Sequence, residues 1–137
     1  MSHLKPLHES DHIDIWHDVD GGFLYADWKG PQTVESVQQG CELILERMIA
    51  HRLTKVLNDN TNVVGSWEAA SHWVAKEFLP RAQRAGVCCI AWVQSPSRGS
   101  RRAANATAMD ARKPDLIHLF DDRRTAELWL RETYSPQ

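Results

Sequence analysis

Short apolar runs alternate with long amphipathic segments along this chain. The clearest run, Val56-Leu57, leads directly into the polar stretch 58–62 and has helical patterns on both sides. A strand covered on both faces is typically a short apolar run, and alternation of strands with helices is typical of parallel strands joined by crossover helices. The order of these patterns therefore predicts an α/β fold with Val56-Leu57 in a central strand.

Five strand patterns and four helix patterns follow this order. We expect strands at 13–19, 23–28, 54–58, 87–93 and 116–120. We expect helices at 33–52, 66–85, 101–112 and from 122 onward, with N-caps at Thr33, Ser66 and Asp122 and a kink near Pro80. The first two strands flank Gly21-Gly22 and form a hairpin. Residues 1–12 carry little apolar content, so we expect a loose start to a single domain, 1–137.

Right-handed crossovers place each new strand beside the last, so we expect a mixed five-stranded sheet in the order 1-2-3-4-5. Its first strand is an antiparallel edge, and helices cover mainly one face. Six Trp is an unusual number for a chain of 137 residues, and an exposed aromatic patch usually marks an interface. We therefore predict a homodimer that buries the uncovered face through Trp16, Trp28 and Trp92. The alternative is that all six Trp belong to the core.

Composition excludes several classes of partner. The net charge of −2 gives no basic field for nucleic acid, and no apolar run reaches the roughly 20 residues that span a bilayer. The first residues lack the apolar segment of a secretory signal. Three Cys, two of them adjacent, fit buried reduced thiols, which predicts a cytoplasmic protein. No metal site and no cofactor are predicted.

Four segments together resemble the SpoIIAA-like branch of the STAS superfamily, which is named after bacterial anti-sigma-factor antagonists. They are Leu24 to Gly30, Lys55 to Asn60, Trp67 to Trp73 before Phe78-Leu79-Pro80-Arg81, and Ala91-Trp92-Val93. The resemblance spans residues 13–133 and implies a compact α/β domain that acts by binding proteins or small ligands. The antagonists' phosphorylatable Asp-Ser-Ser-Gly-like motif is absent. Thr61 or Ser66 replaces its serine by position only.

Two polar segments are candidate sites. Open α/β sheets bind ligands beyond the carboxyl ends of their strands, which points to Asn58, Asp59, Asn60, Thr61 and Ser66. The alternative is that these residues form Asx-turns and cap a loop. Arg98, Arg101 and Arg102 lie in a Gly/Ser segment before a helix, where an anion could bind. The alternative there is a solvated loop.

These observations favour a noncatalytic protein-binding or regulatory module that acts as a homodimer. The alternative is a small-molecule carrier or sensor with an aromatic-lined pocket. An enzyme ranks last because the polar clusters contain no nucleophile–base pair and no Gly-x-Ser-x-Gly motif. Cys88 and Cys89 are expected inside a strand and unreactive.

Overall fold

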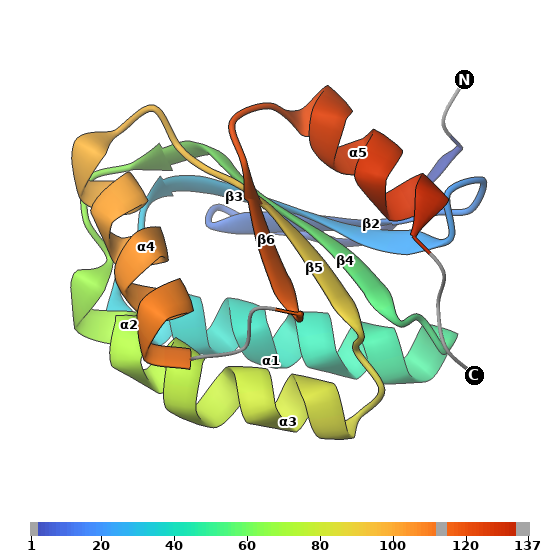
Figure 1. The fold of residues 1–137 in the computed structure, drawn as a ribbon, viewed down its shortest axis with the longest axis horizontal. Coiled ribbons are helices and arrows are strands. Elements are labelled where there is room, and N and C mark those ends of the chain that lie inside the picture. Colours follow the sequence, from blue (N-terminus) through green and yellow to red (C-terminus); the bar gives the residue numbers. More distant parts are fainter. Residues whose placement is uncertain (1–2, 112–114, 134–137) are drawn as a thin grey trace.

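The computed structural model describes residues 3–111 and 115–133, which form a six-stranded sheet with helices on both faces (Figure 1). The strands are β1 Leu4–Glu9, β2 Ile13–Asp18, β3 Phe23–Pro31, β4 Lys55–Val64, β5 Cys89–Val93 and β6 Ile117–Phe120. The helices are α1 Val34–His51, α2 Glu68–Trp73, the π-helix η1 Val74–Phe78, α3 Leu79–Arg84, α4 Arg98–Ala111 and α5 Arg123–Glu132. The expected end of the fourth helix pattern, at 112, lies outside the described residues.

The sheet order is β1-β2-β3-β4-β5-β6. Pairs β1–β2 and β2–β3 are antiparallel, and the remaining pairs are parallel. The predicted α/β fold, the sequential strand order and the hairpin of β2 and β3 are confirmed. The sheet has six strands rather than five.

The additional strand is β1, so the prediction of a loose segment at 1–12 is wrong for Leu4–Glu9. This strand pairs with β2, and its register shifts between Pro6 and His8. A bulge interrupts the period-two pattern that marks a strand, and Pro is tolerated at a sheet edge. Because of the bulge and the proline, the sequence of this segment does not show the pattern that predicts a strand.

Local signals fix the helix ends. Thr33 caps α1, with its Oγ1 accepting from the Ser36 amide at 3.0 Å, and Asp122 caps α5 by accepting from the Thr125 amide at 2.8 Å. Gly86 follows α3 with φ at 106°, a conformation that favours glycine after a helix. Near Pro80 the chain forms the π-helical turn η1, because Pro80 has no N–H to donate to the preceding turn.

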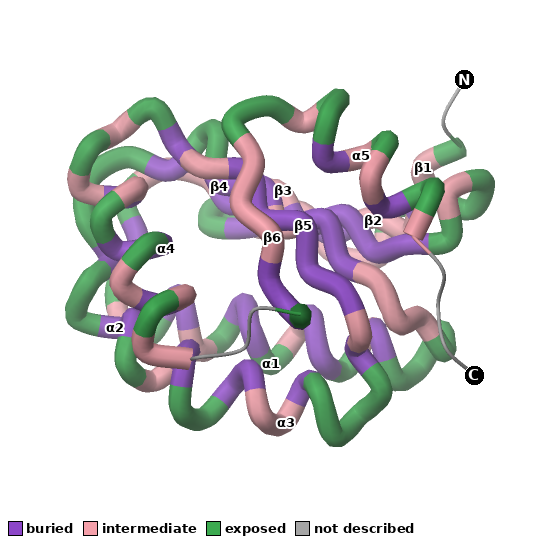
Figure 2. The backbone as a smooth tube through the Cα atoms, viewed as in Figure 1, coloured by how far each residue is buried: buried purple, intermediate pink, exposed green. Residues whose placement is uncertain are grey.

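The two faces of the sheet are covered unequally. Figure 1 shows α1, α2, α3 and α4 on one side and α5 on the other, and each face has its own apolar cluster. The central strands are buried on both faces (Figure 2). Helices therefore cover mainly one face, as predicted, and α5 covers part of the second face because Cys89, Ala91 and Val93 present apolar atoms to it.

The predicted dimer face is wrong for two of its three Trp residues. Trp28 and Trp92 are only 5% and 4% exposed and lie in the cluster beneath the helices. Both side chains point to the face of the sheet that is covered by α1 to α4. Trp16 lies on the α5 side, half-buried, and stacks on Tyr25 with ring centroids 5.4 Å apart. Of the three, only Trp16 remains available to an interface on that face.

The polar stretch 58–62 is a second correction. We predicted a loop, but β4 continues through it to Val64. Asn58 and Asn60 face the helices, while Asp59 faces α5. Successive polar side chains of β4 therefore point to opposite faces of the sheet. On each face they lie among buried neighbouring side chains, so the strand stays extended although this segment is polar.

Candidate ligand-binding cavity

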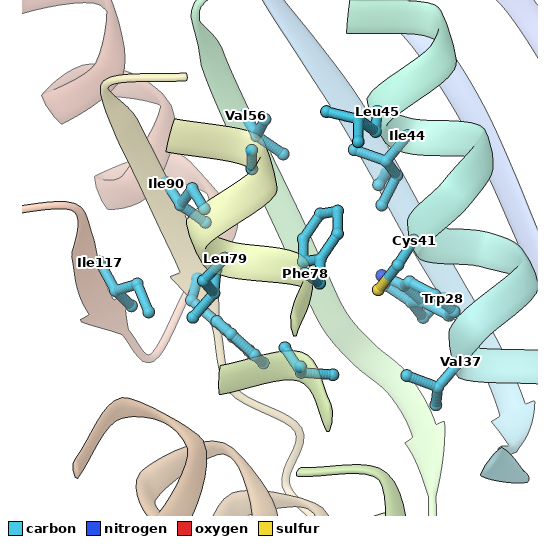
Figure 3. Close-up of a cluster of buried hydrophobic side chains, with 14 of the residues drawn as sticks. Trp28, Val37, Cys41, Ile44, Leu45, Val56, Phe78, Leu79, Ile90 and Ile117 are labelled. Carbon is cyan, nitrogen blue, oxygen red and sulfur yellow. The ribbon is translucent and has the colours of Figure 1, made fainter. Parts of the chain in front are cut away.

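A small cavity lies between the sheet and the helices α1, η1 and α3. Its volume is about 50 Å³, which is room for one or a few water molecules. Figure 3 shows side chains of the sheet and of these helices pointing towards a common space. The apolar wall includes Val37, Cys41, Ile44, Leu45, Met48, Val56, Phe78, Leu79 and Ile90. Burial raises the pKa of the Cys41 thiol, so this residue adds a neutral group to the wall.

Three tryptophans line this cavity: Trp28 from β3, Trp92 from β5, and Trp67 at the start of α2. Trp67 and Trp92 stack with ring centroids 5.8 Å apart and an angle of 13° between their planes. Trp28 packs against α1 at Gly40, where an added Cβ would lie 2.2 Å from its ring. The aromatic rings are therefore positioned by contacts with several elements.

The three indole N–H groups differ in their hydrogen bonding. Trp28 Nε1 donates to Asn58 Oδ1 at 2.8 Å, and Trp67 Nε1 donates to Ser100 Oγ at 3.1 Å. Trp92 Nε1 is buried and has no acceptor within the described part of the chain. A buried donor without a partner costs about 1–3 kcal/mol. The indole of Trp92, a residue of the cavity lining, therefore carries a buried donor whose hydrogen-bonding requirement the described protein does not meet.

Asn58, Asn60 and Gln32 are the polar side chains in the same lining. Gln32 is fully used, since its amide donates to the Lys29 carbonyl at 2.9 Å and accepts from Ser36 at 2.8 Å. Asn58 accepts from Trp28, which leaves its Nδ2 group as a donor. Asn60 is 4% exposed. The surface of the cavity is thus almost entirely apolar, with these amides and the Trp92 indole among the residues that line it, and a mainly apolar lining is typical of sites for small molecules.

The other half of the predicted polar site lies on the α5 side and forms a closed network. Asp59 is 3% exposed and accepts from Tyr25 Oη and from the Thr61 amide, both at 3.0 Å. The Thr61 hydroxyl also donates to Asp59. Arg123 donates to Tyr25 Oη at 3.2 Å, and its guanidinium lies 4.0 Å from the centre of that ring. Burial, and then the Asp59 charge, raise the pKa of Tyr25, so the phenol stays protonated and donates.

Ser66 and the three arginines lie away from the cavity. The prediction that Ser66 is an N-cap is wrong, because the N-cap of α2 is Trp67. Ser66 precedes it, and its Oγ accepts from the Glu68 amide at 3.1 Å. Arg101 pairs with Asp121 at 3.0 Å, while Arg98 and Arg102 are exposed. None of the three arginines lines the cavity. The structure therefore separates the predicted polar residues into three places.

The Gly/Ser segment before α4 has a structural explanation. Ser95 is fully buried and donates to the Val63 carbonyl at 2.7 Å, and it accepts from the Ser97 amide at 3.0 Å. An added Cβ at Gly99 would lie 3.0 Å from the Ser66 amide nitrogen. Small residues here allow the end of β4 to pack against the start of α4. This packing role explains why the segment is rich in Gly and Ser, and it does not require a bound anion.

The sequential sheet, the antiparallel edge and the crossover helices define an α/β fold of the SpoIIAA-like type. The crystal structure of an uncharacterised protein of the DUF3478 family from Shewanella loihica PV-4, described as having a SpoIIAA-like fold, is similar to this chain with a TM-score of 0.53 and 22% identity. The likeness covers 95% of this chain and 97% of that protein. It confirms the predicted resemblance at the level of fold.

No protein-family model matches the chain, and no curated protein sequence matches it. No helix within residues 3–111 and 115–133 is both long and apolar enough to cross a membrane. In the same ranges, no three His, Cys, Asp or Glu side chains gather into a possible metal site.

Sequence reasoning missed that Trp28, Trp67 and Trp92 meet around one space with Asn58 and Asn60. The signal was present in the six Trp and in two polar side chains with the same strand parity as Val56. Side chains at i, i+2 and i+4 of a strand share a face. Applied through 58 and 60, this rule would have placed both Asn beneath the helices.

Proposed function

We propose that this protein is a noncatalytic binding module whose cavity takes a small, mainly apolar molecule bearing an oxygen acceptor. The observation that carries the proposal is the Trp92 indole, which lines a cavity with two other indoles and whose Nε1 has no acceptor among the described residues. A carbonyl, hydroxyl or carboxylate oxygen would accept from this donor and relieve the cost of its burial. This is the small-molecule alternative of the sequence analysis, which the cavity favours over a partner-binding loop.

The remaining donors suit the same chemistry. Asn58 Nδ2 and the Asn60 amide lie in the same lining, and Asn58 and Trp92 are direct neighbours in the β4–β5 register. Two or three N–H donors around one oxygen favour an ionised or strongly polar head group. The apolar wall would hold the rest of the molecule through burial of its surface.

The cavity is too small to admit a ligand without a conformational change. At about 50 Å³ it is smaller than the several hundred Å³ of a typical ligand pocket, so the wall has to move. Val74 and Phe78 belong to the π-helical turn η1 and line the cavity. Such turns are frequent at functional sites. In the proposal, a shift of η1 enlarges the cavity as the ligand enters.

Isothermal titration calorimetry with straight-chain carboxylates from butyrate to decanoate tests this function. We expect affinity to rise with chain length until the wall resists further expansion, because each buried methylene contributes about 0.8 kcal/mol. Trp92→Phe should weaken binding by about tenfold through loss of one hydrogen bond to a charged group. Trp129→Phe, on the α5 side, is the matched control and should leave affinity unchanged. Absence of binding across the series would refute the proposal.

A homodimer is a second proposal, supported by a different observation. Helix α5 packs mainly against β4, β5 and β6, so the β1–β2 edge of this face lies at the margin of the cluster beneath α5. Trp16 lies there, half-buried, on Tyr25. Analytical ultracentrifugation should give a dimer that Trp16→Ser weakens. A monomer at high micromolar concentration would contradict it.

A further inference from the structure

Cys88 and Cys89 form a pair of neighbouring thiols at the start of β5. Their Sγ atoms are 3.1 Å apart, although consecutive residues of a strand point to opposite faces. The pair escapes this alternation because β5 begins at Cys89 and Cys88 precedes it. Both residues pack against the apolar cluster beneath α5. This arrangement corrects the expectation that both cysteines lie inside a strand.

The two thiols differ in exposure. Cys88 is half-buried, whereas Cys89 is 6% exposed. Burial, followed by the hydrogen bond to Cys88, raises the pKa of Cys89 to about 12. Lys55 pairs with Cys89 in the sheet register, and its Nζ donates to the Leu130 carbonyl at 2.8 Å. Reagents therefore reach Cys88 first, and Cys89 is positioned as the second ligand.

We propose that Cys88 and Cys89 form a binding site for soft, thiophilic species with the chemistry of monosubstituted trivalent arsenicals. Thiols are the soft ligands of proteins and select soft partners. Two sulfurs already in contact are close to the separation they take when bonded to one arsenic atom, so little rearrangement is needed. Two bonds from one protein also hold such a species far longer than one bond does, because the second bond forms within the same molecule.

The reaction is a condensation without net oxidation. The Cys88 thiol adds across the arsenic–oxygen double bond of phenylarsine oxide, forming one sulfur–arsenic bond and one hydroxyl on arsenic. The Cys89 thiol then displaces that hydroxyl, and a second sulfur–arsenic bond forms. The two thiol protons leave with the oxygen as water, and arsenic remains trivalent.

This site is separate from the cavity of the proposed function. Cys41 lies in the cavity wall on the helix side and is 4% exposed. Cys88 and Cys89 lie on the α5 side. The third cysteine therefore provides an internal control, and the outcome does not depend on whether the cavity binds a ligand.

Intact-protein mass spectrometry of the folded chain with phenylarsine oxide tests the proposal. The protein is first reduced with a phosphine, and glutathione is present as a competing monothiol. We expect one phenylarsenic per chain, with water lost, and release by dithiothreitol. Cys41→Ala should retain the adduct. Labelling that appears only in denaturant would overturn the proposal, because the native pair would then be inaccessible.

Cys88→Ser and Cys89→Ser separate a two-sulfur site from a single reactive thiol. Each should reduce retention of the adduct against glutathione by about a hundredfold. Circular dichroism checks that each variant is folded, and Cys88→Ser is the decisive one because that side chain is half-buried. Retention at the wild-type level in Cys88→Ser would show that the two thiols do not act together and would overturn the inference.

Discussion

The two faces of β4 use polar residues in opposite ways. On the α5 side, Asp59 is bonded to Tyr25 and Thr61 in a closed network. On the helix side, Asn58 accepts one indole N–H, and the neighbouring indole of Trp92 has no acceptor among the described residues. The first arrangement is complete without a ligand and stabilises the fold. The second is incomplete, and we assign binding to it for that reason.

The largest expected effect comes from breaking the closed network. Asp59→Ala removes the acceptor of Tyr25 and Thr61 and leaves polar groups buried near Arg123, so we expect a loss of about 3 kcal/mol in the free energy of unfolding. Urea denaturation measures it. Binding of carboxylates per folded molecule should be unchanged. Asp121→Ala is the control, since the Asp121 side chain is 77% exposed, and it should cost little.

The packing of Trp28 against α1 gives the next effect. Gly40→Ala places a methyl group 2.2 Å from the Trp28 ring, which displaces the ring towards the cavity. Overpacking costs about 1–3 kcal/mol, partly offset by the better helix propensity of Ala. We expect about 1–2 kcal/mol lower stability in urea and weaker carboxylate binding. Gln39→Ala, on the exposed side of α1, is the control. Unchanged affinity in Gly40→Ala would place the ligand elsewhere.

A matched pair of tryptophan variants isolates the unpaired donor. Trp28→Phe leaves the Asn58 oxygen without its donor, whereas Trp92→Phe removes a donor that has no acceptor in the described structure. Both lose similar packing, so Trp28→Phe should be less stable than Trp92→Phe by about 1 kcal/mol. Thermal and urea unfolding measure the difference. Equal losses in the free energy of unfolding for the two variants would show that Trp92 Nε1 makes a hydrogen bond in solution that is as stabilising as that of Trp28.

The smallest effect concerns pH. Burial, and then the neighbouring His51, lower the pKa of His17 below 6.5. The unfolded chain then binds more protons in this range, so stability contributed by His17 is present above the unfolded pKa and falls as pH drops through it towards the folded pKa. His17→Gln should lose less stability than the wild type between neutral pH and the lowered pKa. Urea midpoints across this range give the comparison, and parallel pH dependences would contradict it.

Strand order and helix positions could be predicted from the sequence because local patterns carry them. The caps at Thr33 and Asp122 and the irregular helical turn before Pro80 are encoded by a few residues each. The bulged β1 could not be predicted, because its alternation is interrupted. The extension of β4 through 58–62 was hidden for another reason. Its polar residues are stabilised by distant partners such as Tyr25 and Trp28, which only the fold brings near.

The candidate site was predictable in part. The sequence points to Asn58 and Asn60, whereas it predicts Trp28 and Trp92 on an exposed face. Side chains of a strand alternate between the two faces of the sheet, so the position of an aromatic residue decides which face it occupies. Composition alone does not show which of these faces α1 to α4 cover. The unpaired N–H of Trp92 depends on the exact neighbours of one atom, which no sequence pattern reports.

The most direct test of the central claim is the indole N–H region of a nitrogen-15 correlation spectrum during titration with decanoate. The Trp92 Nε1–H resonance, assigned by its loss in Trp92→Phe, should shift downfield as this group gains an acceptor. The resonances of Trp16 and Trp129, on the other face, should stay in place. A titration in which Trp92 is unmoved, or in which Trp16 and Trp129 shift instead, would contradict the assignment of binding to the cavity.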